Sequence, residues 1–178
     1  MFTIKPCSIE DVDTIMDMQD HVIVINNKTD KGSWYIVTER CDLEEGLKNN
    51  DLLVLGAYCN GELAACIAMS FGDPHGMFKT LLNNYQNNED KQFAYAKMAI
   101  VKEAYRGHGL QRTLLRALEA EALKNPKIKY MGAIVHPDNS FSLKNVLAEG
   151  YENKGRAIPD PHPGYPRVLL FKTLDRQN

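Results

Sequence analysis

The sequence lacks the features that would direct a protein to a metal ion, a membrane or nucleic acid. Its four cysteines, Cys7, Cys41, Cys59 and Cys66, form no Cys-x-x-Cys pair, so we expect reduced, mostly buried thiols and no metal site. No apolar run approaches the ~18 residues of a membrane span. Residues 1–13 have no continuous apolar core of the kind that a secretory signal needs. We therefore expect a cytoplasmic protein that has neither a membrane nor nucleic acid as a partner.

Charge and composition narrow the class further. Lys and Arg number 21 against 23 Asp and Glu, a balance that gives no long-range attraction for nucleic acid. The chain has 178 residues, of which 44% are hydrophobic, as is typical of a globular domain. No repeat and no linker rich in Pro, Gly or Ser divides it, so we expect a single domain over residues 1–178.

The hydrophobic pattern alternates between strands and helices. Asn60-Gly61 separates two apolar runs and supplies the positive φ angles of a type I′ turn, which predicts a β-hairpin. Ser8 and Asp11 have the spacing of a capping box, which predicts a helix start. The expected strands are residues 2–5, 52–59, 62–70, 93–101, 130–135, 151–157 and 167–174. The expected helices follow Ser8, ending before the polar residues 26–33, and cover residues 42–48, 77–85, 109–124 and 140–149. This order predicts the α/β (α+β) class, with a mixed central sheet of about seven strands flanked by about four helices.

The loop between the strand 93–101 and the helix 109–124 carries the most specific signal. A helix start leaves about four amides without partners and carries roughly half a positive charge. Residues 105–110 supply no Ser, Thr, Asp or Asn cap, and Arg106, His108 and Arg112 add positive charge there. Gly107 and Gly109 allow close approach to the backbone. A bound phosphate or pyrophosphate would satisfy all of these features, whereas a plain turn with solvated basic residues is the alternative.

Two common phosphate motifs do not fit this loop. A P-loop requires GxxxxGK[ST], and no Lys-Ser or Lys-Thr pair follows these glycines. A dinucleotide fingerprint requires GxGxxG, and the third glycine position is Arg112.

Val101-x-x-x-Tyr105-Arg106-Gly107-x-Gly109-Leu110 instead resembles motif A of the GNAT (Gcn5-related) N-acetyltransferase superfamily, whose signature is [RQ]-x-x-G-x-[GA]. The signature positions are Arg106, Gly109 and Gln111, and Gln111 departs from the usual Gly or Ala. Downstream, Asn139 is followed eleven residues later by Gly150 and Tyr151, which is similar to motif B of the family. The expected order of elements resembles the family over essentially the whole chain.

The resemblance implies a binding site for acetyl-CoA as the co-substrate. The strand before the loop would lend its backbone to the pantetheine arm, the loop would hold the pyrophosphate, and the start of the next helix would add polar contacts. The residues concerned are Met98, Ala99, Ile100 and Val101 on the strand, Arg106, Gly107, His108, Gly109, Leu110, Gln111 and Arg112 on the loop and helix start, and Asn139 and Ser142. From the residues alone, Asn139 is equally an N-cap candidate.

The catalytic residues are less clearly marked. Many members place a tyrosine seven residues after the asparagine, where it protonates the departing thiolate, and here that position is Val146. Tyr151, Tyr95 or a water would substitute, or the thiolate leaves without a dedicated acid. The candidate bases are His136, Glu103, Asp73 and His75.

The resemblance thus implies an N-acetyltransferase that moves an acetyl group from acetyl-CoA to a primary amine of a small molecule or peptide. The alternatives are an acyl-CoA-binding module with little catalysis and, less well supported, a protein that binds another phosphate ligand at the same loop. A homodimer is left open.

Overall fold

A computed structural model of the chain describes residues 1–29, 31, 34–72, 93–156 and 166–175. Its centre is a seven-stranded sheet with the order β1-β2-β3-β4-β5-β7-β6, in which β4 and β5 are parallel and the other neighbours are antiparallel. The strands are β1 (Thr3–Pro6), β2 (Leu52–Cys59), β3 (Glu62–Phe71), β4 (Phe93–Val101), β5 (Tyr130–Val135), β6 (Glu152–Arg156) and β7 (Val168–Thr173).

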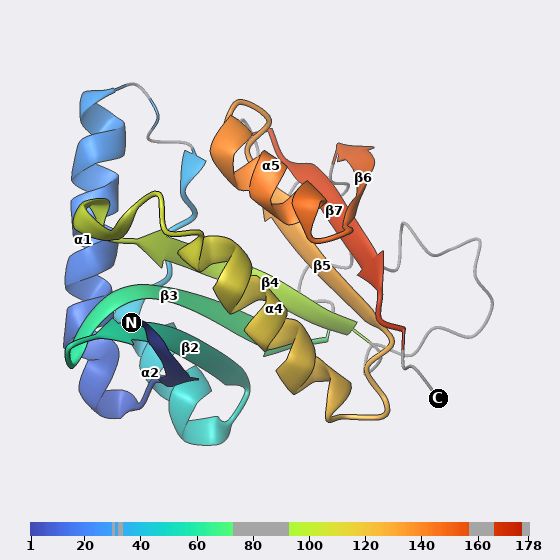
Figure 1. Cartoon of the computed structure of the whole chain (residues 1–178), viewed down its shortest axis with the longest axis horizontal. Helices are drawn as coiled ribbons and strands as arrows, with labels where there is room; N and C mark the ends of the chain where they lie inside the picture. The colour runs from blue at the N-terminus through green and yellow to red at the C-terminus, as the bar shows by residue number, and fades with distance from the viewer. Residues whose placement is uncertain (30, 32–33, 73–92, 157–165, 176–178) are drawn as a thin grey trace.

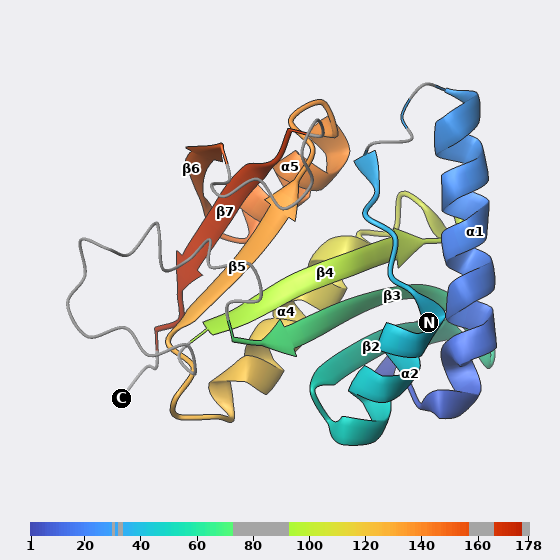
Figure 2. The same cartoon turned by 180° about the vertical axis from the view of Figure 1, so that it is seen from behind.

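The helices cover the two faces of this sheet (Figures 1 and 2). Helices α4 and α5 lie on one face, and α1 and α2 lie on the other. Their bounds are α1 (Val12–Lys28), α2 (Arg40–Asn49), α4 (Leu110–Leu123) and α5 (Ser140–Ala148), with 3-10 turns η1 (Ile9–Asp11) and η4 (Glu103–Tyr105). No helix in the described part of the chain is long and apolar enough to cross a membrane.

Each face has its own hydrophobic core. Under α4 the sheet buries Leu110, Leu114 and Leu118, which recur at helical spacing and are at most 4% exposed. Under α1 and α2 the core contains Ile15 and Leu43, both fully buried. Because the sheet is covered on both faces, its central strands are apolar on both sides, as the unbroken runs in β2 and β3 indicate.

Most of the expected elements are confirmed. Asn60 and Gly61 have φ values of 50° and 84°, as a type I′ turn requires, and join β2 to β3. Ser8 and Asp11 form the expected capping box. Strands β4 and β5 have the expected bounds, and the mixed sheet of the α/β class is present.

Two expectations, the end of the first helix and the burial of the cysteines, were wrong in part, and a third concerns residues that the structure does not describe. The first helix does not end before residue 26 but continues to Lys28, where Thr29 caps it with hydrogen bonds to the carbonyls of Ile25 and Asn26. Cys7 and Cys66 are buried as expected, whereas Cys41 is exposed on α2 and Cys59 is half-buried, so all four are free but not mostly buried. The expected helix over residues 77–85 lies outside the described residues, as do Asp73 and His75.

Candidate active site

Strands β4 and β5 separate halfway along β4, and this divergence is the centre of the site (Figure 2). Residues 93–96 of β4 pair with residues 130–133 of β5, whereas Lys97, Ile100 and Val101 pair, within the described strands, only with β3. At the same point β4 bulges, because Met98 and Ala99 together stand opposite the single residue Ile67 of β3. Met98 has a positive φ of 53° at this irregularity. Among the strands that the structure describes, none pairs with the edge of residues 97–101 that faces β5.

The loop after β4 presents a row of free backbone amides. Within the described residues, the N–H groups of residues 107–112 have no hydrogen-bond acceptor, and α4 has no side-chain cap. Gly107 and Gly109 take φ values of 83° and 70°, and a Cβ at either position would meet open space. Consecutive amides exposed at a helix N-terminus are a site for a phosphate group.

Contacts with the sheet fix the base of this loop. Glu62 of β3 accepts hydrogen bonds from Lys102 Nζ at 2.7 Å and from the Tyr105 hydroxyl at 3.0 Å. Phe2 packs edge-on against the rings of Tyr105 and His108. The loop is thus held before any ligand binds.

The three basic residues of the loop have different surroundings. Arg106 is exposed beside the open amides. His108 turns back, with Nδ1 3.2 Å from the carbonyl oxygens of Tyr105 and Arg106. Arg112 instead binds Glu149 at the end of α5, and Arg116 binds the same carboxylate at 2.6 Å. The charge of Arg112, which the resemblance assigns to the pyrophosphate, is therefore paired with an acid that α5 brings from 37 residues away.

A polar network joins α4 to α5 next to the gap. Gln111 donates to the Ser142 hydroxyl at 2.9 Å and accepts from the Asn145 side chain at 2.8 Å. The glutamine at the third signature position is therefore held against α5. Asn139 Oδ1 accepts the Ser142 amide at 3.2 Å, which confirms that Asn139 caps α5.

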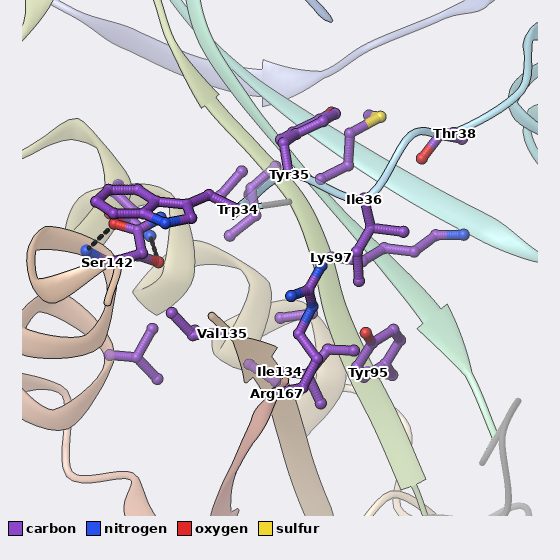
Figure 3. A pocket seen from close by; sticks show the side chains of 18 of the residues that line it. Trp34, Tyr35, Ile36, Thr38, Tyr95, Lys97, Ile134, Val135, Ser142 and Arg167 are labelled. Atoms are coloured by element: carbon purple, nitrogen blue, oxygen red, sulfur yellow. Dashed lines mark hydrogen bonds between the residues drawn. The ribbon is translucent and has the colours of Figure 1, made fainter. Parts of the chain in front are cut away.

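A cavity of about 290 Å³ lies at the gap and is lined by residues from both faces of the sheet. On one side its lining includes Gln111, Asn139, Ser142 and Val146 from α4 and α5. On the other side it includes the segment 34–38, the β4 residues 95–99, and Arg167 just before β7. Figure 3 shows Tyr95, Lys97 and Arg167 grouped at one end, with Trp34 towards Ser142.

Gln19 of α1 holds the segment 34–38 against the body of the protein. Its side chain is 1% exposed; Nε2 donates to the Thr38 carbonyl at 3.0 Å, and Oε1 accepts the Thr38 amide at 2.9 Å. The Tyr35 hydroxyl donates to the same Oε1 at 3.2 Å. A buried amide that bonds both backbone groups of one residue fixes one wall of the cavity.

The structure places the three candidate catalytic residues in different surroundings. Tyr95 lines the cavity, and burial raises its pKa, although the charge of Arg167 opposes that rise. His136 stacks on Trp34, with ring centroids 6.0 Å apart, and so stands one residue behind the lining. Tyr151 packs in the core beside Lys172 and Glu119, where burial and then the charge of Glu119 raise its pKa. Of the three, the structure therefore brings only Tyr95 to the cavity wall.

The protonation state of His136 follows from its surroundings. Its side chain is 7% exposed, and burial lowers its pKa, helped by the nearby charge of Arg167 and opposed by Asp138. Nδ1 accepts the Asp138 amide at 3.2 Å, so in the neutral imidazole the proton is on Nε2. The other candidate base among the described residues, Glu103, is exposed in η4.

Sequence reasoning missed Trp34, Lys97 and Arg167, all of which line the cavity. Lys97 had a local signal, because it interrupts the otherwise apolar run of β4. Arg167 had a weaker one, since it precedes an apolar strand on the same alternating face as Leu169 and Phe171. Trp34 follows the polar residues 26–33 and precedes the apolar Tyr35, Ile36 and Val37, and this pattern gave no signal for a site.

Comparisons with known proteins agree with this geometry. Over 97% of this chain and 95% of the other, the structure is similar to an aminoglycoside acetyltransferase AAC(6')-Ib in complex with coenzyme A and kanamycin, with a TM-score of 0.68 and 16% identity. It is similar to yncA of Salmonella typhimurium, a putative acetyltransferase with its cofactor acetyl-CoA, over 100% of this chain and 96% of the other (TM-score 0.71, 15% identity). It is also similar to a ribosomal-protein-alanine N-acetyltransferase from Brucella melitensis over 97% and 99% (TM-score 0.71, 17% identity).

These identities establish a shared fold. No curated protein matches the sequence. The sequence model of the Acetyltransferase (GNAT) family matches residues 19–145, which include α4, the glycine-containing loop before it and the start of α5. This match covers more than half of the chain, and the chain therefore belongs to the GNAT acetyltransferase family.

Proposed function

We propose that the protein transfers an acetyl group from acetyl-CoA to a primary amine, by direct attack within a ternary complex. The observation that supports this most strongly is the divergence of β4 from β5 at Lys97, where backbone without a partner among the described strands lines the cavity. Acetyl-CoA complexes among proteins of the same fold give independent support.

The residues present fit the co-substrate. The open amides of residues 107–112, with Arg106 beside them, would bind the pyrophosphate. The unpaired edge of residues 98–101 would hydrogen-bond the pantetheine amides as a strand would. Asn139 and Ser142 line the same cavity and would contact the arm.

When bound, acetyl-CoA supplies an acetyl group activated as a thioester. A bond forms between the acceptor nitrogen and the carbonyl carbon while the carbon–sulfur bond breaks. The sulfur leaves with the electron pair and takes up one proton, and the amine releases one proton. A backbone N–H at the bulge of β4 would stabilise the charge that develops on the carbonyl oxygen.

Tyr95 is the proton donor that we propose for the thiolate. Its raised pKa keeps the hydroxyl protonated at neutral pH, and it lies on the cavity wall. Tyr95→Phe should lower kcat roughly 10²-fold or more if it is the acid. Tyr151→Phe is the matched control, because that ring lies in the core. Equal activity of both variants and the wild type would mean that water protonates the sulfur.

His136 is the base that we propose, acting through a water. Its lowered pKa keeps the imidazole neutral at neutral pH, with Arg167 among the causes. His136→Gln should reduce kcat most above the lowered pKa of His136 and below the pKa of the acceptor amine, where the imidazole is neutral and the amine is protonated. The difference should vanish at lower pH, where the imidazole of the wild type is itself protonated. An unchanged pH profile would assign deprotonation to solvent.

Release of the CoA thiol in the presence of a broad panel of amines tests the proposed function, and direct binding of acetyl-CoA is measured beside it. Thiol release that requires an amine supports the acetyltransferase. Binding without release favours the alternative, an acyl-CoA-binding module, which the apolar Val146 on the cavity wall would suit. Binding of ATP that acetyl-CoA does not displace would instead indicate that the loop binds another phosphate ligand.

A further inference from the structure

Lys97 brings a primary amine into the cavity, at the point where β4 leaves β5. Its side chain is half-buried, and Figure 3 shows it together with Ile36 and Tyr95. Among the described residues, none forms a hydrogen bond or an ion pair with its ammonium group. Burial lowers the pKa of Lys97, opposed by the charge of Asp42, and this favours the neutral amine. A desolvated lysine of this kind is suited to act as a nucleophile.

The pleat of β4 directs Lys97 away from α4. Ala94 and Ala96 lie in the core under α4. Phe93 and Tyr95 lie in a separate core on the opposite face, and Lys97 continues their alternation along the strand. Lys97 therefore faces the side of the sheet that α1 and α2 cover.

The proposed function places the reacting thioester next to this side chain. The open amides of residues 107–112 and the hydroxyl of Ser142 lie on the α4 and α5 side, so the CoA moiety would lie there with its acyl end at the gap. The backbone N–H proposed for the carbonyl oxygen belongs to the bulge at Met98 and Ala99, directly after Lys97. Lys97 thus stands across the sheet from the CoA moiety, on the side from which an amine would attack.

We propose that Lys97 accepts the acetyl group itself when no acceptor amine is bound, so that the protein acetylates its own chain and thereby limits its own activity. The inference rests on the proposed function. A bond forms between the neutral Nζ and the carbonyl carbon while the carbon–sulfur bond breaks. The sulfur leaves with the electron pair and takes up one proton, and Nζ releases one proton. The product is an amide, which is far less reactive than a thioester, so the acetyl group stays on Lys97 and occupies the acceptor side of the cavity.

The test incubates the full-length protein with acetyl-CoA alone and locates the acetyl groups by peptide mass spectrometry. Lys48 of α2 is the internal reference, because it is exposed and ion-paired with Glu44 at 3.6 Å. A nucleophile held beside the thioester has a high effective molarity, so Lys97 should be acetylated roughly tenfold or more faster than Lys48. At saturating acetyl-CoA the rate should not depend on protein concentration, and excess free CoA should suppress it. Equal acetylation of both lysines would overturn the inference.

Variants connect the modification to activity. Preincubation of the wild type with acetyl-CoA should lower later amine-dependent thiol release in proportion to the acetylated fraction. Lys97→Arg keeps the charge and should show no such loss, whereas Lys48→Arg should lose activity as the wild type does. An equal loss in Lys97→Arg would contradict the inference.

The mapping on the wild type does not depend on the folding of any variant, and it separates the two proposals. Amine-dependent thiol release by a protein whose Lys97 stays unmodified would overturn self-acetylation and leave the acetyltransferase intact. Absence of both amine-dependent release and acetylation of Lys97 would overturn the proposed function as well.

Discussion

The loop before α4 provides the sharpest test of the pyrophosphate site, through a single added methyl group. Gly107 has a φ of 83°, and a Cβ at this position would meet no atom within 4 Å. Gly107→Ala therefore creates no clash within the protein, but it places a methyl group in the open space beside the amides of residues 107–112. The variant should fold and should bind acetyl-CoA more weakly.

The size of the effect can be worked out in advance. At ~100-fold over Kd, binding to the native state adds about 2.7 kcal/mol to the free energy of unfolding. For a chain of this length each kcal/mol shifts Tm by roughly 2–4 °C, so acetyl-CoA should raise the Tm of the wild type by roughly 5–11 °C. A tenfold weaker Kd at the same concentration leaves about 1.4 kcal/mol, or about half of that shift.

Gly155→Ala is the matched control. Gly155 on β6 has a φ of 85°, and its Cβ would also meet no atom within 4 Å. Both variants should therefore lose a similar free energy of unfolding without ligand, about 1–2 kcal/mol, from left-handed backbone strain. Thermal melting with and without acetyl-CoA separates strain from binding. A full ligand-induced shift in Gly107→Ala would refute the assignment of these amides to the pyrophosphate.

Charge reversal provides a second test of the pyrophosphate site, and the structure shows which arginine is suitable for it. Arg106→Glu should reduce the shift, because Arg106 is exposed beside the amides. Arg112→Glu is not a clean test, since it would place a second carboxylate against Glu149 and destabilise the native state with or without ligand.

Three further predictions concern stability and the acceptor side. Hydrogen bonds from Arg116 and Arg112 hold the pKa of Glu149 below its ordinary value of 4.5, although burial opposes them. The Glu149 carboxylate therefore stabilises the native state fully above pH 4.5, and this contribution is lost as the pH falls through the lowered pKa. In urea unfolding, the wild type should lose free energy below pH 4.5 more steeply than Glu149→Gln, and parallel curves would contradict this. Val146→Tyr should lower the free energy of unfolding by roughly 1–3 kcal/mol without raising kcat, because Val146 is 4% exposed in the core. A higher kcat would mean instead that a tyrosine at this position can act as the missing acid. Gln19→Leu should lower the free energy of unfolding by about 1–3 kcal/mol, because it leaves both backbone groups of Thr38 without the Gln19 amide. It should also raise the KM of the acceptor more than the KM of acetyl-CoA. Equal changes in both KM values would show that the segment 34–38 does not border the acceptor site.

The sequence alone was sufficient wherever near neighbours decide the conformation. Asn60-Gly61 predicted its turn because positive φ angles suit those two residues, and Ser8 with Asp11 predicted the first turn because a cap bonds amides two or three residues away. The glycine-containing loop was recognisable because the absence of a side-chain cap is itself a local property.

Tertiary structure decided which distant groups meet. The partner of Arg112 is Glu149 on another helix, and nothing near Arg112 in the sequence announces it. The bulge at Met98 depends on the register with β3, and Tyr151 was withdrawn from the cavity by the packing of α4 and β7. Lys97 and Arg167 are separated by most of the C-terminal half of the chain, and they line one cavity only because β4 and β5 diverge between them. Capping and turn patterns act over a few neighbouring residues, whereas the residues of this site meet only because the sheet and helices bring distant segments of the chain together.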